Sequence, residues 1–174
     1  MPKSQSATLP IAYILLRILV VLNWLYGACL LALLIFSSVN EPFFMRALKL
    51  GSPSDNPPLV WGVRAIATLG ILTVPINLAM LKRMLAMVDT VRAGDPFVAA
   101  NAYRLNAIAW LLLLLQLVSL VVALIGKAVS TPAHPLHLDA GFSPGGWLAV
   151  ILTFVLARVF AEGTLMREDL EGTV

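Results

Sequence analysis

The residues of this sequence that could do chemistry are a few polar side chains set within long apolar stretches. Arg158 and Glu162 stand four positions apart, a spacing at which two side chains on one helix can form an ion pair. Arg17 and Asn77 stand near the corresponding ends of two other apolar stretches. An ionisable group inside a bilayer is costly and usually faces a partner, a cavity or the interface. If these stretches are membrane helices, the four residues predict one intramembrane polar layer.

Two interpretations of this polar layer stay open. In the first it locks the helices together while Arg17 extends toward lipid phosphates. In the second it forms a pocket that senses a ligand or gates a partner. A proton or ion pathway is less well supported, because such a path usually needs acidic groups at several depths and Glu162 is the only one within a span.

No known catalytic arrangement of residues is present in the sequence. We find no glycine-rich phosphate loop, nucleophile elbow, pair of catalytic carboxylates or metalloprotease helix. His134, His137 and Asp139 form an H-x-x-H-x-D pattern, but Pro135 interrupts it and a closed zinc site normally has four ligands. We therefore expect a solvated loop there, no bound metal, no cofactor and no enzyme activity.

The composition identifies the environment of the chain. Of its 174 residues 60% are hydrophobic and 12% are charged, whereas soluble domains carry about 25% charged residues. This composition predicts an integral membrane protein, with residues 1–174 forming a single transmembrane domain in contact with the lipid bilayer. The net charge of +3 is spread along the sequence rather than gathered in a basic patch, so direct binding of nucleic acid is not expected.

Hydropathy and turn residues divide the chain into four apolar helices. About 20 apolar residues cross a bilayer, and the helices are expected at about 10–36, 59–92, 98–127 and 146–166. Between them lie a central polar loop at about 82–104, which includes helix ends that leave the membrane, and outer loops at 37–58 and 128–145. Within the first outer loop, the apolar residues 42–50 predict a short interfacial helix.

The distribution of basic residues predicts which side each loop occupies. Lysine and arginine favour the cytoplasmic ends of membrane helices, and most of them lie on the side of the central loop: Lys3, Lys82, Arg83, Arg92, Arg104 and Arg167, against Arg46, Lys49 and Lys127 on the other side. The sequence therefore predicts an all-α, integral membrane four-helix bundle with both termini in the cytoplasm.

Small residues recur at every fourth position of the fourth span: Gly145, Ala149, Thr153, Ala157 and Ala161. This spacing lets another helix backbone approach closely. The approaching helix belongs either to the same bundle or to a second copy in a homo-oligomer, and the pattern serves both equally well.

The central loop contains a tight turn between two helices. Gly94 stands where a helix would stop, Asp95-Pro96 favours extended backbone, and Phe97 follows as an exposed aromatic unless it tucks beneath the bundle. The C-terminal tail is predicted on the same side. We expect loop and tail to form a partner-binding surface: Arg92, Gly94, Asp95, Pro96, Phe97, Asn101, Arg104, Glu168 and Asp169. The alternative is a connecting turn with Phe97 as its hydrophobic plug.

The turn also carries a family resemblance. Gly94-Asp95-Pro96-Phe97, followed by Asn101 and Arg104-Leu105, resembles the G-x-P-F…N-x-x-R-L pattern of a bacterial membrane family, domain of unknown function 2975 (DUF2975). The acidic tail at 165–174 resembles the ending of that family. Val98 departs from the pattern where a threonine is usual, and Gly172 where an apolar residue is usual.

This resemblance implies a role but no activity. Genes of the family often lie beside genes for small helix-turn-helix regulators, so the resemblance implies a membrane partner of a cytosolic transcription regulator in the bacterial inner membrane. We expect a multi-pass regulatory or sensor protein. A small-molecule transporter or channel subunit using Arg17, Asn77, Arg158 and Glu162, and a structural subunit of a membrane complex, are the alternatives.

Overall fold

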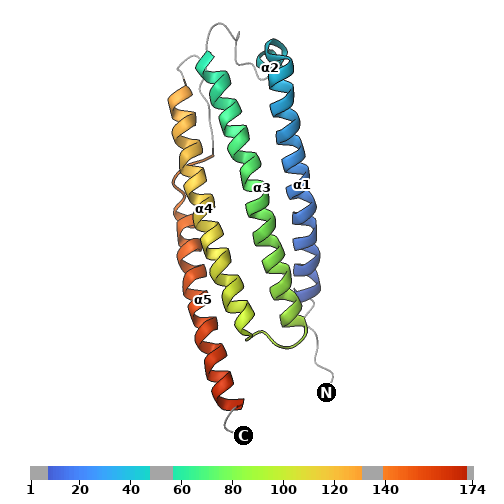
Figure 1. Cartoon of the computed structure of the whole chain (residues 1–174), viewed down its shortest axis with the longest axis vertical. Coiled ribbons are helices and arrows are strands. Elements are labelled where there is room, and N and C mark those ends of the chain that lie inside the picture. The colour runs from blue at the N-terminus through green and yellow to red at the C-terminus, as the bar shows by residue number, and fades with distance from the viewer. Residues whose placement is uncertain (1–7, 48–56, 131–138, 172–174) are drawn as a thin grey trace. The chain divides into compact units, whose positions relative to one another are not determined.

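A computed structural model of the chain describes residues 8–47, 57–130 and 139–171. Over these residues every regular element is an α-helix (Figure 1). The all-α prediction is therefore confirmed for the described part of the chain. The helices are α1 (Thr8–Val39), α2 (Glu41–Ala47), α3 (Pro57–Arg92), α4 (Ala99–Val129) and α5 (Pro144–Glu171).

Four of these helices are long and apolar enough to cross a membrane. The candidate spans, found among the described residues, are Leu9–Val39, Pro58–Arg92, Ala99–Val129 and Pro144–Arg167, with mean hydropathies of 2.4, 1.8, 2.8 and 1.9. Roughly 20 apolar residues are enough to cross the hydrocarbon layer. The prediction of four membrane-spanning helices is confirmed at this level, and the protein is of the multi-pass membrane type.

Proline and glycine mark several helix ends. Pro57 and Pro144 are the first residues of α3 and α5, where the missing N–H of proline costs no hydrogen bond. Gly94 follows α3 with a φ of 85°, a conformation that glycine adopts at little cost after a helix. Pro75 lies inside α3, which continues as a helix on both sides of it.

The chain divides into two compact units, and each long helix except α5 contributes to both. The first unit consists of Met1–Asn23, Ile76–Leu114 and Pro144–Val174, and the second of Trp24–Pro75 and Leu115–Ser143.

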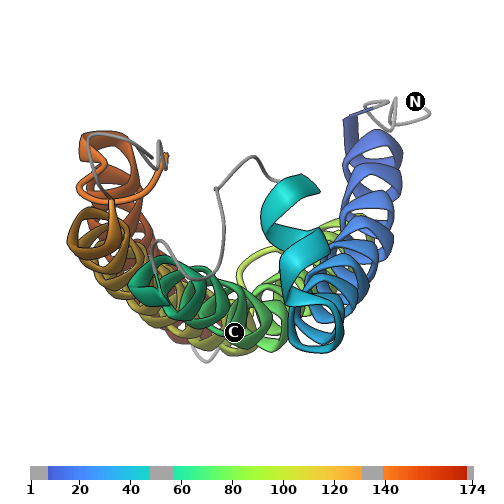
Figure 2. The ribbon, with the colours of Figure 1, turned by 90° about the horizontal axis from the view of Figure 1, so that it is seen from above.

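In the first unit the helices lie in the order α1, α3, α4, α5 (Figures 1 and 2). The guanidinium of Arg92 on α3 lies 5.2 Å from the ring centre of Tyr13 on α1. The Asn101 side chain of α4 reaches Thr90 of α3, and Trp110 of α4 meets Phe154 of α5 edge to face at 5.3 Å. The buried apolar side chains are few: Leu16, Leu81, Leu105, Ile108, Ala109, Val150 and Ala157.

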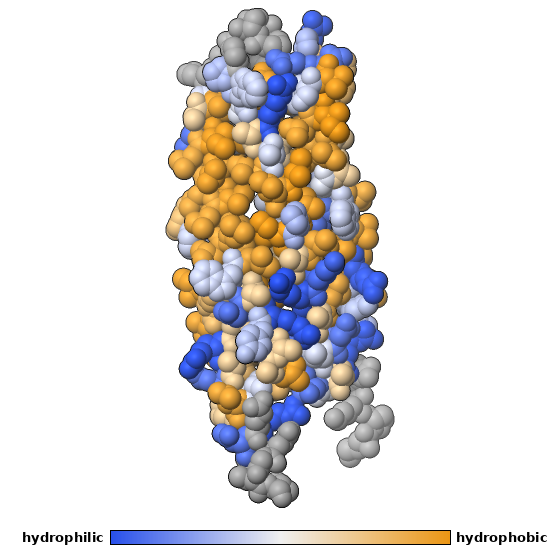
Figure 3. All heavy atoms as spheres, in the orientation of Figure 1, coloured by the Kyte–Doolittle hydropathy of each residue, from blue (hydrophilic) through white to orange (hydrophobic). Residues whose placement is uncertain are grey.

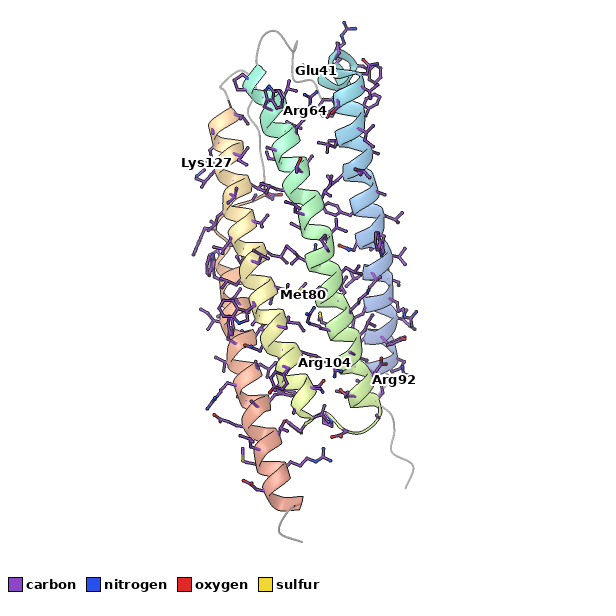
Figure 4. The ribbon with its side chains drawn as sticks, in the orientation of Figure 1. Glu41, Arg64, Met80, Arg92, Arg104 and Lys127 are labelled. Carbon is purple, nitrogen blue, oxygen red and sulfur yellow. The ribbon has the colours of Figure 1, made fainter. Side chains whose placement is uncertain are left out.

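In the second unit α2 packs against α1 and α3. Phe44, Leu59 and Val60 form a buried apolar cluster. The Arg64 Nη2 group of α3 donates hydrogen bonds to the backbone oxygen of Ser37, at 2.5 Å, and to Glu41 Oε2, at 2.9 Å (Figure 4). One arginine therefore joins the end of α1, the start of α2 and α3.

The segment before α5 folds back along α4. The N–H of Gly141 donates to Ser119 Oγ at 3.0 Å, and the Ser119 hydroxyl lies 3.3 Å from Gly141 O. Ser119 precedes Lys127, near the end of α4, by eight residues, or about 12 Å of helix. The described end of the expected outer loop at 128–145 thus lies beside α4, more than two helical turns before the end of that helix.

Much of each helix surface is uncovered by the rest of the chain. In an 18-residue apolar stretch of α1, only 6% of the residues are buried, against 28% in the corresponding stretch of α3, the most enclosed of the four long helices. In the first unit, Figure 3 shows hydrophilic side chains gathered near the α3–α4 connection, with apolar side chains on the rest of the visible helix surface. An apolar exterior of this kind suits contact with lipid rather than water.

Candidate functional site

The connection between α3 and α4, residues 93–98, is a hydrogen-bonded turn, here called the α3–α4 turn. The backbone N–H groups of Ala93, Gly94 and Asp95 donate to the carbonyl oxygens of Asp89, Val91 and Thr90, at 3.0, 3.1 and 3.0 Å. These bonds satisfy carbonyl groups that the end of a helix leaves without partners. The left-handed backbone of Gly94 then redirects the chain away from α3.

Asn101 holds the turn from the inside. Its side chain is fully buried; Nδ2 donates to Thr90 Oγ1 at 2.7 Å and to Pro96 O at 2.9 Å. Its Oδ1 accepts from Arg104 Nη1 at 2.7 Å. The single amide therefore links the end of α3, the turn and the start of α4. In this structure it shapes the surface without being exposed on it.

Phe97 connects the turn to α5. Its ring lies 5.2 Å from the Phe160 ring, and a Cβ added at Gly163 would stand 3.2 Å from Phe97 Cδ1. The absence of a side chain at Gly163 thus allows the ring to lie close to the helix. Phe97 nevertheless keeps 43% of its surface exposed, so its ring both fills a gap against α5 and remains accessible.

A second contact joins the turn to the tail. Arg167 Nη1 of α5 forms an ion pair and hydrogen bond with Asp95 Oδ1. The two residues are 72 positions apart, and both side chains are partly exposed. α5 ends at Glu171, four residues or about 6 Å beyond this contact. The tail is therefore a helical extension of α5 that passes the turn, as Figure 1 shows.

The remaining residues of the expected partner surface lie near this contact or beside α1. Asp169 is exposed, and Glu168 belongs to α5 although its side chain lies outside the described part of the structure. Arg92 is exposed and lies over Tyr13. Arg104, labelled with Arg92 in Figure 4, is half-buried and is held by Asn101.

The residues of the expected polar layer form separate contacts. Arg158 Nε donates to Glu162 Oε1 at 2.8 Å, and both side chains are largely exposed. Arg17 Nη2 donates to Tyr13 Oη at 2.6 Å, with the guanidinium also 5.1 Å from the ring centre. Asn77 is half-buried on α3. The structure brings Arg158 and Glu162 together and gives Arg17 a different partner.

The small-residue stripe of α5 changes its surroundings along the helix. Apart from its chain neighbours and the nearby backbone of α5, no described heavy atom lies within 4 Å of a Cβ built at Gly145, and Ala149 is exposed. Thr153 donates its hydroxyl to Ala149 O, within its own helix, at 2.7 Å. Ala157 is buried and Ala161 half-buried. The part of the stripe nearest the turn is therefore the part that other atoms cover.

A groove of about 520 Å³ lies between α4 and α5 in the first unit. From α4 it is lined by Ala99, Ala102, Tyr103 and Asn106, and from α5 by six residues between Phe154 and Leu165, among them Ala157, Arg158 and Ala161. Small side chains on both helices leave this space. Most of its lining is apolar. The exposed residues Tyr103, Asn106 and Arg158 and the buried Thr164 contribute its polar groups.

The histidine pattern cannot be placed. His134 and His137 lie outside the described residues, and Asp139 is the first described residue after them. Within residues 8–47, 57–130 and 139–171, no three histidine, cysteine, aspartate or glutamate residues come close enough together to hold a metal ion.

Several residues that organise the site were not singled out from the sequence. Tyr13 meets both Arg17 and Arg92, and its spacing of four from Arg17 is a helical contact spacing that could have revealed it. Thr90 and Gly163 contact Asn101 and Phe97 across different elements, and no local pattern indicates such contacts.

Comparison with known proteins gives one match. The model of a family described as "Protein of unknown function (DUF2975)" matches residues 22–174, which include the second half of α1 and everything after it. No curated protein and no solved structure matches the chain. The match covers the α3–α4 turn, the groove and the tail.

Proposed function

The chain belongs to the DUF2975 family, and because the function of that family is unknown, we propose a role from the surface of the protein itself. The protein is a regulatory or sensor protein of the bacterial inner membrane. It binds a cytosolic protein at the turn–tail surface, defined as residues 93–98 and the end of α5 at 166–171. A helix-turn-helix transcription regulator is the partner that the family resemblance implies.

The observation that carries this proposal is the connection of turn and tail. The Asp95–Arg167 ion pair and the Phe97–Phe160 ring contact make one surface from segments distant in sequence. Phe97 is 43% exposed and Met166 62% exposed there, beside charged groups. Aromatic, methionine and arginine side chains are enriched at protein interfaces, so this surface has the composition that a protein partner needs.

The surface is also ordered before any partner arrives. Asn101 is fully buried and uses its amide for three contacts that fix the turn. A preformed surface loses little conformational entropy on binding. This favours a binding role over that of a loose connection.

The orientation follows from the charges beside the helices. Lys82, Arg83, Arg92, Arg104 and Arg167 lie at or near the turn end of their helices, and the excess of basic residues at that end favours the cytoplasmic side. We therefore place both termini and the turn–tail surface in the cytoplasm.

The test is affinity purification of the full-length protein from its native cells in mild detergent. Met166→Glu introduces a negative charge on the exposed turn–tail surface. Lys127→Glu is the control, because it introduces a glutamate at the end of α4 that lies away from the turn. We expect a helix-turn-helix protein to copurify with the wild type and with Lys127→Glu. With Met166→Glu its recovery should fall by about tenfold, because burying an unpaired charge in the interface costs about 1.4 kcal/mol or more of binding free energy. Absence of such a protein, or equal recovery with both variants, contradicts the proposal.

A further inference from the structure

We infer that the groove between α4 and α5 is a binding site for one anionic phospholipid, with the phosphate held at Arg158 and the upper part of an acyl chain lying on the alanines. This site is separate from the turn–tail surface and does not depend on a protein partner.

The groove lies where the membrane surface is expected. On α4 it reaches from Ala99 to Asn106, and Tyr103 and Arg104 stand directly before the apolar run that begins at Leu105. Tyrosine and arginine in such a position are typical of the boundary between hydrocarbon and headgroups. On α5 the groove reaches from Phe154 to Leu165, or about 16 Å of helix. It therefore extends from the apolar layer into the headgroup region.

The interior of the groove suits an acyl chain. Ala102, Ala157 and Ala161 line it, together with the apolar side chains of Phe154 and Leu165. The Trp110–Phe154 ring contact stands at its membrane-core end. A volume of about 520 Å³ falls within the usual range of 300–1,000 Å³ for small-molecule sites.

Arg158 supplies the charge that a lipid phosphate would match. Its side chain is 78% exposed, and its ion pair with Glu162 uses Nε. Among the described residues, no hydrogen bond engages its two terminal nitrogens, which are the groups that bind phosphate in a bidentate manner. Tyr103, 76% exposed, and Asn106 add hydrogen-bonding groups on the opposite wall.

These features favour a lipid over two other occupants. A helix from a second copy would bring apolar side chains against Arg158 and Glu162, and desolvating that exposed pair is costly. Free inorganic phosphate would bind the Arg158 guanidinium but would leave the apolar side chains of the groove uncovered. A phospholipid satisfies both parts, and basic pockets between membrane helices are known to bind anionic headgroups.

The test is native mass spectrometry of the full-length protein released from detergent micelles with dioleoylphosphatidylglycerol or dioleoylphosphatidylcholine. Arg158→Gln removes the charge, Ala161→Phe fills the groove, and Arg46→Gln is the matched control, an exposed arginine on α2 that lies outside the groove. We expect the wild type to retain one phosphatidylglycerol about fivefold better than phosphatidylcholine, the preference given by one basic residue near an anionic lipid.

Arg158→Gln should abolish this preference, Ala161→Phe should lower retention of both lipids, and Arg46→Gln should behave as the wild type. Circular dichroism of each variant checks that the helices are intact. Equal retention of the two lipids by the wild type overturns the inference, as does displacement of the lipid by excess inorganic phosphate. A dimer that Ala161→Phe dissociates, with lipid retention unchanged, overturns it in favour of a second copy.

Discussion

At the scale of single residues, Asn101 is the side chain on which the α3–α4 turn depends most. It is fully buried, and both ends of its amide are used by groups from α3, the turn and α4. A buried polar group left without its partners costs far more than an ordinary exposed one. The sequence indicated Asn101 as part of a binding surface, whereas its contacts show how that surface is built.

Replacement of Asn101 by alanine should therefore destabilise the protein. The substitution removes three hydrogen bonds and leaves the Thr90–Pro96 region with unsatisfied groups, so we expect a loss of about 1–3 kcal/mol. Thermal unfolding of the detergent-purified protein, followed by tryptophan fluorescence, measures the change in midpoint.

Asn106→Ala serves as the control, because Asn106 is an exposed asparagine on the same helix. Equal unfolding midpoints for Asn101→Ala and the wild type would show that the amide contacts do not hold the turn.

The sequence could indicate the turn but not its attachment to α5. Gly94, Asp95 and Pro96 carry local information, because each restricts the backbone in a known way. The Asp95–Arg167 pair joins residues 72 positions apart, and the Phe97–Gly163 contact depends on how α5 packs. Pairings of this kind depend on tertiary geometry, which hydropathy does not contain.

At the scale of the helices, α3 connects the parts of each unit. In the second unit its Arg64 guanidinium donates hydrogen bonds to Ser37 O and to Glu41 Oε2, so one charged group joins α3 to α1 and α2. The arginine side chain is only 19% exposed. This contact is therefore partly shielded from solvent and is stronger than a surface ion pair.

Arg64→Gln should loosen α2. Loss of hydrogen bonds from a charged, mostly buried donor costs about 1.5–3 kcal/mol, and the effect should be local because the other contacts of α3 remain. Hydrogen exchange measured by mass spectrometry should show faster exchange over residues 41–47, with little change over the α3–α4 turn.

Arg46→Gln is the matched control for this experiment, since Arg46 is an exposed arginine on α2 itself. Unchanged exchange in α2 after Arg64→Gln would mean that the apolar cluster around Phe44 is sufficient to hold the helix.

Hydropathy predicted the existence of the four long helices better than their ends. The fourth was expected over 146–166, whereas α5 extends to Glu171, five residues further. Its last turns are polar, so apolar composition could not reveal them. The contact of Gly141 with Ser119 was also not predicted, because a loop rich in proline and glycine carries no signal for the part of a neighbouring helix that it contacts.

The small-residue stripe shows the same limit at the helix scale. Spacing predicted a face that another backbone can approach, and Ala157 is indeed covered. At Ala161, however, the alanines of α4 stand opposite, and a groove results. Small residues permit close packing of helices. They leave a space instead when the small residues of one helix lie opposite the small residues of the other.

At the scale of the whole molecule, the proposed orientation makes a direct prediction. With Cys29 replaced by serine, the variants Ala93→Cys in the turn and Lys127→Cys at the far end of α4 each carry one exposed cysteine. A membrane-impermeant maleimide should label Lys127→Cys in intact cells, because the excess of basic residues places the turn inside.

Ala93→Cys should be labelled only after the membrane is permeabilised. Labelling of Ala93→Cys in intact cells, with Lys127→Cys protected, would reverse the orientation and remove the turn–tail surface from the cytoplasm.

The measurement that tests the central claim most directly is photo-crosslinking in living cells. A photoreactive amino acid at Met166 places the probe on the turn–tail surface, and the same amino acid at Trp61, which is 70% exposed in the second unit, is the control. If the turn–tail surface binds a cytosolic regulator, Met166 will give a crosslinked adduct with a soluble helix-turn-helix protein and Trp61 will not. Adducts from Met166 with integral membrane proteins alone, or the same adducts from both positions, would contradict the account.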